Sequence, residues 1–79
     1  MDTRLQELRP GEAGRVKGFH KADRDYRQRL LAMGLLPGVI FTVTRVAPLG
    51  DPVEIRLRNF PLTLRKSEAD VLRVERVQP

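Results

Sequence analysis

The 79-residue chain contains no cysteine, which excludes disulfide bonds, thiolate metal ligands and a thiol nucleophile. Its one histidine is His20, and its one serine is Ser67, which we interpret as the cap of a short helix. Catalysis generally needs a nucleophile with a base, paired carboxylates or a metal that activates water. The carboxylates of this chain are dispersed, and the phosphate-binding patterns GxxxxGKS/T and GxGxxG are missing. We therefore predict that the protein is not an enzyme and requires no cofactor.

Long hydrophobic runs are missing too. No stretch approaches the ~18 consecutive apolar residues of a membrane span, and the first residues do not lead into the apolar core of a signal peptide. The length suffices for a single domain, which we place at residues 1–79. We expect a cytoplasmic protein without direct membrane insertion.

Alternating hydrophobic residues are prominent in the second half of the chain and predict β-strands. Val39, Phe41 and Val43 form one such series, and residues 53–58 form another. Further strands are expected at 13–19, 62–65 and 71–77. The break in parity at residues 45–46, and the glycines within the first strand, predict a bend or bulge in each of these two strands.

The clearest helix signal begins at Asp23, a suitable N-cap residue. Tyr26, Leu30 and Met33 recur at helical spacing and place an apolar stripe on one side of the helix. Gly34 follows directly, where a helix commonly ends with a residue of positive φ. Pro37 and Gly38 then suit the two central positions of a type II turn. The sequence therefore predicts one helix, inserted after the first strand.

Together these patterns predict a mainly β fold, a small partly open barrel of about five strands. Curling such a small sheet buries its apolar face and protects its edges. The inserted helix at about 23–33 would then cover one open end. Capping-box spacing predicts additional one-turn helices near 3–8, from Thr3 and Gln6, and near 67–70, from Ser67 and Asp70.

Four motifs are more specific than this periodicity. They are RLLAMGL at residues 29–35, PG at 37–38, APLGDP at 47–52 and LRK at 64–66. Together they resemble the FeoA family, small cytoplasmic proteins of the bacterial ferrous iron transport system. The resemblance extends over essentially the whole chain.

This resemblance implies an SH3-like barrel and a regulatory role in ferrous iron uptake. The implied partner is the membrane transporter FeoB, whose cytoplasmic part is a G-protein domain. Docking there would bring the chain to the inner face of the membrane. Because the same domain occurs at the C-terminus of some iron-dependent repressors, a related regulatory or dimerisation module is an alternative.

A metal site is a separate hypothesis. His20, Asp23 and Asp25 lie close together in the sequence, and imidazole and carboxylate groups are ligands for Zn²⁺ or Fe²⁺. These three residues would form a weak divalent metal site. The alternative interpretation is a solvated histidine beside an ordinary helix N-cap.

The partner-binding surface is predicted from exposed apolar and basic residues. Leu49 and Phe60 both fall in turns, where apolar side chains can serve as contacts. Arg56, Arg58 and Arg65 are placed on the outer face of neighbouring strands, where they would steer an acidic partner.

Two other binding functions stay open. The net charge of +5 suits nucleic acid, but with only 5% aromatic residues the chain lacks a platform for stacking bases. We therefore expect no nucleic-acid binding. Pairing of edge strands between two chains would give a homodimer, which is compatible with docking onto another protein.

Overall fold

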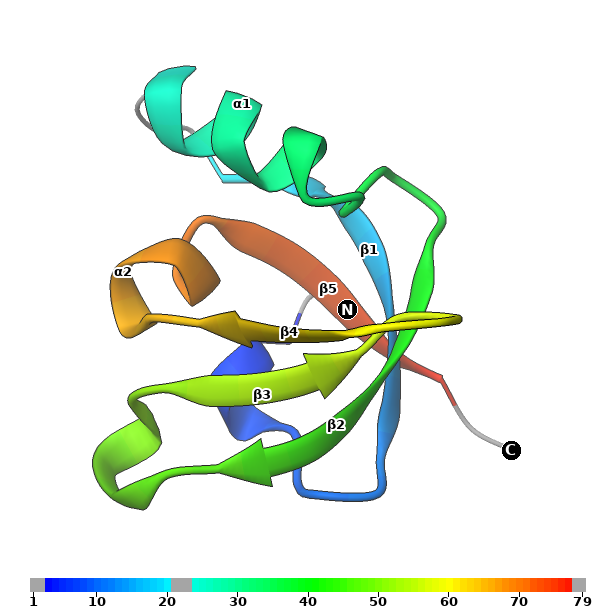
Figure 1. Cartoon of the computed structure of the whole chain (residues 1–79), viewed down its shortest axis with the longest axis vertical. Coiled ribbons are helices and arrows are strands. Elements are labelled where there is room, and N and C mark those ends of the chain that lie inside the picture. Colours follow the sequence, from blue (N-terminus) through cyan, green and yellow to red (C-terminus); the bar gives the residue numbers. More distant parts are fainter. Residues whose placement is uncertain (1–2, 21–23, 78–79) are drawn as a thin grey trace.

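The computed structural model describes residues 3–20 and 24–77 (Figure 1). The strands are β1 (Ala13–Phe19), β2 (Ile40–Val46), β3 (Val53–Arg56), β4 (Pro61–Leu64) and β5 (Leu72–Val77). The helices are α1 (Arg24–Ala32) and α2 (Lys66–Ala69), with single 3₁₀ turns η1 (Leu5–Glu7) and η2 (Pro48–Gly50). No helix among these residues is long and apolar enough to span a membrane.

The five strands form one antiparallel sheet in the order β4-β3-β2-β1-β5. The two edge strands, β4 and β5, follow each other in the chain, and the single turn of α2 lies between them. Since so short a connection must link the two edges, the sheet curls strongly, as Figure 1 shows. This is a mainly β, partly open SH3-like barrel, which confirms the predicted fold class.

Two bulges bend this sheet. The register shifts between Val16 and Gly18 where β1 pairs with β5, and between Val43 and Arg45 where β2 pairs with β3. Both bulges lie where the sequence predicts them. Because a bulge bends its strand and increases the local twist, the two shifts help five short strands to curl around a small core.

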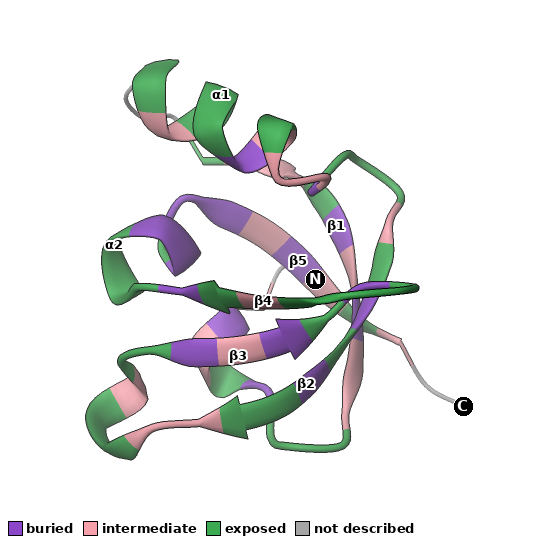
Figure 2. Ribbon diagram, viewed as in Figure 1, coloured by how far each residue is buried: buried purple, intermediate pink, exposed green. Residues whose placement is uncertain are grey.

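The core lies inside the curled sheet (Figure 2). The alternating residues of β2 and β3 supply its centre, with Phe41, Val43, Val53 and Ile55 fully buried. Helix α1 lies over one open side of the barrel (Figure 1). It adds a fully buried Leu30, so burial of apolar surface from both strands and helix stabilises the fold.

The predicted stripe of α1 is confirmed. Tyr26 and Met33 are partly buried and pack against the core on either side of Leu30. The arginines of α1 are exposed, as expected for its polar face. The helix extends over Arg24–Ala32 within the described residues, and the predicted cap, Asp23, lies outside them.

The one-turn helix near the N-terminus is confirmed, but its predicted cap is wrong. The Glu7 carboxylate, not Gln6, closes the turn by accepting the Arg4 backbone N–H at 3.3 Å. Thr3 instead pairs with Val74 of β5, and its backbone N–H donates to the Val74 carbonyl at 2.8 Å. The strand partner therefore takes priority over the local capping pattern at Thr3.

The one-turn helix expected at 67–70 occurs one residue earlier, as α2. Its N-cap is Arg65, whose backbone N–H donates to the Glu68 carboxylate at 3.0 Å. Ser67 lies inside the helix and is not its cap, which corrects the predicted pairing of Ser67 with Asp70. A glutamate reaches back to the cap more readily than an aspartate because its side chain is longer.

Candidate docking site

An apolar groove opens between the end of α1 and the turn that joins β3 to β4. Its volume is about 650 Å³. Its lining comes from two segments, within 34–40 and 57–60. These segments are distant in the sequence, so the groove exists only in the folded barrel.

Gly34 ends α1 and forms part of the groove. Its backbone N–H donates to the Leu31 carbonyl at 3.0 Å, and that of Leu35 donates to the Leu30 carbonyl at 3.1 Å. This is the Schellman pattern, which requires positive φ at the glycine, and φ is 98°. A Cβ atom at Gly34 would lie 3.6 Å from Leu57, so the helix end borders directly on the second wall.

A second turn follows immediately at residues 36–39. The Val39 backbone N–H donates to the Leu36 carbonyl at 3.0 Å, and Gly38 has φ of 93°. This geometry matches the predicted type II turn with Pro37 and Gly38 at its centre. Because nothing lies within 4 Å of a Cβ built at Gly38, the groove is open at this point.

The turn between β3 and β4 forms the other wall. The Leu57 backbone N–H donates to the Phe60 carbonyl at 2.9 Å and closes the turn. Leu57 is nearly buried, whereas Arg58, Asn59 and Phe60 are exposed. This wall therefore has an apolar base and a polar, basic tip.

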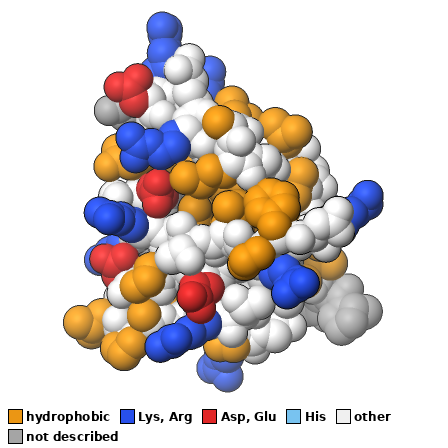
Figure 3. Space-filling model, viewed as in Figure 1, with side chains coloured by type: hydrophobic (Ala, Val, Ile, Leu, Met, Phe, Trp, Pro, Cys, Tyr) orange, Lys and Arg blue, Asp and Glu red, His pale blue; other side chains and the backbone are white. Residues whose placement is uncertain are grey.

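Large apolar side chains are exposed around the groove. Leu36 and Ile40 are each 50% exposed, and Phe60 is 44% exposed. Figure 3 shows hydrophobic side chains gathered on this part of the surface, with Lys or Arg side chains at its margin. Scattered single apolar residues are ordinary on protein surfaces, but several around one groove indicate a binding site.

The charge at the groove is positive. Among the described residues, Arg58 is the only charged one in the lining, and no carboxylate contributes to it. Arg56 lies on the same strand end, on the outer face of β3, where Pro61 and Thr42 are its register partners. No ion pair joins Arg56 or Arg58 to an acidic side chain within residues 3–20 and 24–77.

The structure divides the predicted docking residues between two ends of the barrel. Arg58 and Phe60 line the groove, and Arg56 lies near them. Leu49 is at the opposite end of β3, in the η2 turn, where it is 98% exposed with φ of 68°. Arg65 is also at that end, since the neighbouring Lys66 N–H donates to Asp51 at 3.1 Å.

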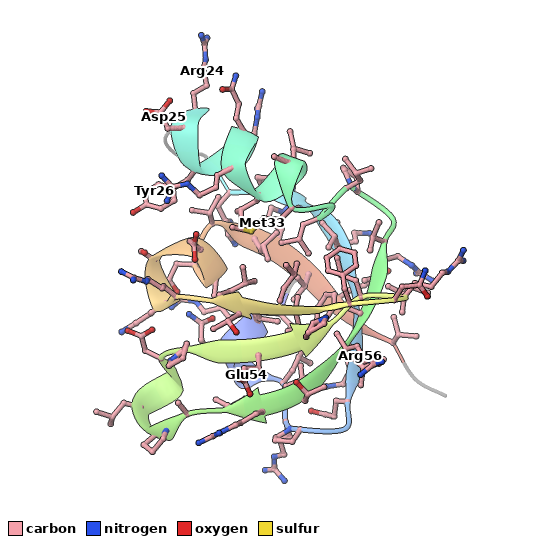
Figure 4. The ribbon with its side chains drawn as sticks, viewed as in Figure 1. Arg24, Asp25, Tyr26, Met33, Glu54 and Arg56 are labelled. Atoms are coloured by element: carbon pink, nitrogen blue, oxygen red, sulfur yellow. The ribbon has the colours of Figure 1, made fainter. Side chains whose placement is uncertain are left out.

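Figure 4 shows Glu54 and Arg56 at different positions along β3. Glu54 precedes the middle of the strand and pairs in register with Thr63, whereas Arg56 ends it opposite Pro61. Of the three arginines predicted to share the outer face of neighbouring strands, only Arg56 lies in a strand, because Arg58 is in the turn after β3 and Arg65 is the N-cap of α2. Only Arg56 and Arg58 lie close to the groove.

The predicted metal site, His20, Asp23 and Asp25, falls only partly within the described residues. His20 is exposed after β1 and lines a polar pocket of about 440 Å³ together with Glu7 and Asp70. Asp25 lies in the first turn of α1 (Figure 4), and Asp23 falls outside the described part of the chain. Within residues 3–20 and 24–77, no group of three or more His, Cys, Asp and Glu side chains is arranged to hold a metal ion. The site stays a prediction.

Ile40, which lines the groove, and Leu36, an exposed residue of the same segment outside the lining, are absent from the predicted contacts. A signal was available for Ile40, because it has the opposite strand parity to Phe41 and Val43 and so must face outward. Leu36 precedes the Pro-Gly turn, where a large apolar side chain without a strand partner is also notable. What the sequence could not indicate is that the 57–60 turn lies beside them.

Known proteins whose sequences are similar to that of this chain indicate one family. The FeoA domain family model matches residues 3–76. An Fe(2+) transport protein A/Fe(2+) transporter FeoB fusion protein of Porphyromonas gingivalis is 37% identical over 75 residues. That match covers 91% of this chain, but the chain spans only 8% of the length of the fusion protein.

Solved structures agree with this family. A FeoA-like protein from Clostridium acetobutylicum has a TM-score of 0.85 and 32% identity, over 99% of this chain and 90% of that one. A manganese-dependent transcriptional repressor has a TM-score of 0.86 over 96% of this chain and 42% of the repressor. Its identity of 16% indicates a shared fold and no more. The family model and the relatives above 30% identity establish that this chain belongs to the FeoA family, whose members take part in ferrous iron transport.

Proposed function

We propose that this chain is a non-catalytic accessory protein of ferrous iron uptake that docks onto the cytoplasmic G-protein domain of the transporter FeoB. The observation that carries the proposal is the Porphyromonas gingivalis fusion protein, in which an FeoA part and an FeoB part belong to one polypeptide. Covalent linkage keeps two modules at high effective concentration. An FeoA domain that is not fused to FeoB would need a binding surface of its own to reach the same partner.

The surface of the barrel supports a docking role. Exposed apolar side chains surround a groove on one side of the molecule, and Arg56 and Arg58, which form no ion pair within the described residues, lie beside it. Apolar contacts would supply most of the affinity, and the arginines would favour an acidic partner and speed its association. The protein would act in the cytoplasm, at the inner face of the membrane.

The test is direct binding to the purified G-protein domain of the FeoB protein from the same organism. Biolayer interferometry with the immobilised domain should give saturable binding of this chain, at physiological salt and with either GDP or a GTP analogue loaded. An unrelated small GTPase on a parallel sensor is the control. If this chain binds neither nucleotide form, or binds both GTPases equally, the proposal is wrong.

The alternative functions give different results in two further measurements. Tight binding of the chain to RNA or DNA that weakens steeply with salt would indicate a nucleic-acid protein. Light scattering that shows a concentration-independent dimer would favour a dimerisation module. The proposal expects neither result for the isolated chain.

A further inference from the structure

We propose that the groove between residues 34–40 and 57–60 binds a partner segment in which an apolar side chain is flanked by carboxylates. We name this surface the α1–β3 groove. The inference rests on the proposed docking function, which it extends by assigning the face and the chemistry of the occupant.

The apolar part of the occupant follows from the exposed surface. Ile40 and Phe60 line the groove and are each about half exposed, and Leu36, in the same chain segment as Ile40, is also half exposed. Covering such apolar surface removes it from water, which favours binding. A groove of about 650 Å³ has room for one large apolar side chain together with its neighbours in the partner segment.

The acidic part follows from charge complementarity. Of the residues that the structure describes, the lining includes one cation, Arg58, and no anion, and Arg56 is near it on the same strand end. Neither arginine has an ion pair with an acidic side chain in the described parts of the chain. The whole chain carries a net charge of +5. A basic partner would be repelled, whereas carboxylates beside the apolar anchor would gain charge-assisted hydrogen bonds from the guanidinium groups.

The groove is also fixed in place before any partner arrives. The Gly38 backbone N–H donates to the Val16 carbonyl at 2.7 Å, and the Val16 N–H donates to the Val39 carbonyl at 2.9 Å. Leu35 is fully buried in the core. These contacts hold the 34–40 wall against β1, so little conformational entropy is lost when the groove is filled.

Two pairs of variants test the assignment, with the FeoB G-protein domain as the probe. Ile40→Asp and Arg58→Glu alter the groove, and Leu49→Asp and Arg24→Glu make matched changes at exposed positions elsewhere. We expect each groove variant to weaken the affinity about tenfold or more. The matched controls should stay within about twofold. Far-UV circular dichroism of all four variants verifies the fold.

Nuclear magnetic resonance of the ¹⁵N-labelled wild-type chain gives an independent result. Addition of the unlabelled G-protein domain should shift the amide signals of 34–40 and 57–60 more than those around residue 49. If Ile40→Asp fails to fold, Arg58→Glu and this mapping still decide the matter.

The outcomes separate the two proposals. If the wild-type chain does not bind the G-protein domain at all, the docking function is wrong and the inference fails with it. If it binds but the groove variants bind equally well, or if Leu49→Asp abolishes binding, the function stands and the groove is the wrong face. Shifts at 34–40 and 57–60 that appear on concentrating the chain alone would identify a second copy as the occupant and overturn the inference.

Discussion

Gly14 shows how a single residue can be fixed by packing and not by backbone conformation. It is buried in β1 and pairs in register with Phe41 of β2. A Cβ atom at this position would lie 2.6 Å from the Phe41 ring and 3.1 Å from Leu8. The glycine therefore leaves space that the largest core side chain occupies.

The change Gly14→Ala should lower the free energy of unfolding by about 1–3 kcal/mol, because the added methyl group overpacks the core. Urea denaturation monitored by circular dichroism measures this loss. The double variant with Phe41→Leu should lose less than the sum of the two single variants, since the smaller ring-free side chain makes room for the methyl group. Additive losses would show that Gly14 matters for some reason other than contact with Phe41.

The roles of some glycines are predictable from the sequence, and the role of Gly14 is not. Gly34 and Gly38 were predicted as a helix end and a turn because local signals, a preceding stripe and an adjacent proline, specify positive φ. Gly14 gives no such local signal of its packing role, and the sequence indicates only a bend or bulge in the first strand. Its role depends on Phe41, which lies on another strand, so it becomes visible only when the register is known.

At the scale of the element, α2 closes the barrel with a single helical turn between the two edge strands. Its key residue is Glu68, whose side chain is nearly buried. One carboxylate oxygen accepts the Arg65 backbone N–H at 3.0 Å, and the other lies 3.9 Å from the Arg29 guanidinium of α1. The same side chain thus caps α2 and faces the helix that covers the core.

Removing this cap should destabilise the fold. We expect Glu68→Ala to lower the free energy of unfolding by about 1 kcal/mol, as for other lost caps. Glu68→Gln should cost less, because the amide oxygen can still accept the Arg65 N–H. Thermal unfolding of the two variants beside the wild type measures the difference. If alanine and glutamine are equally destabilising, the charge toward Arg29 and not the cap is the important feature.

The bounds of helices and strands are likewise predictable only where neighbouring residues in the sequence determine them. The strands, both bulges and the stripe of α1 were predictable, because period and parity depend on neighbours in the sequence. The predicted N-caps of η1 and α2 lie one and two residues away from the observed ones, Arg4 and Arg65. In both, a glutamate three residues after the cap closes the turn, and at Thr3 the pairing with β5 overrides the local pattern.

The α1–β3 groove belongs to the scale of the whole molecule. The sequence predicts Phe60 as a contact in a turn and Arg58 as a contact on the outer face of a strand. Grouping them with Leu49 and Arg65 ignores which end of β3 each residue occupies. The register of β3 with β4 places Arg56 opposite Pro61 and Val53 opposite Leu64, and this separates the two groups. Without that register, the sequence does not show at which end of the barrel each residue lies.

Charge also acts on the whole molecule, through the pairing of β1 with β5. Glu75 of β5 accepts a hydrogen bond from Arg15 of β1 at 2.8 Å, and Lys17 lies 3.6 Å away. The hydrogen bond from Arg15 is the main cause that lowers the pKa of Glu75 below its ordinary value, and the charges of Lys17 and Arg15 add to it. Ionised Glu75 therefore favours the folded barrel.

A group whose pKa is lower in the folded state stabilises the fold above its unfolded pKa, about 4.3 for glutamate, and loses this contribution as pH falls through the folded pKa. Glu75→Gln should therefore be less stable than the wild type at neutral pH, and the two stabilities should converge in acid. Urea unfolding across a pH series measures both curves. Because Glu75 is open to solvent, molar salt should narrow the neutral gap by screening. A gap that persists unchanged in acid would mean that glutamine disturbs the β1–β5 pairing through its shape, and that the charge of Glu75 contributes nothing.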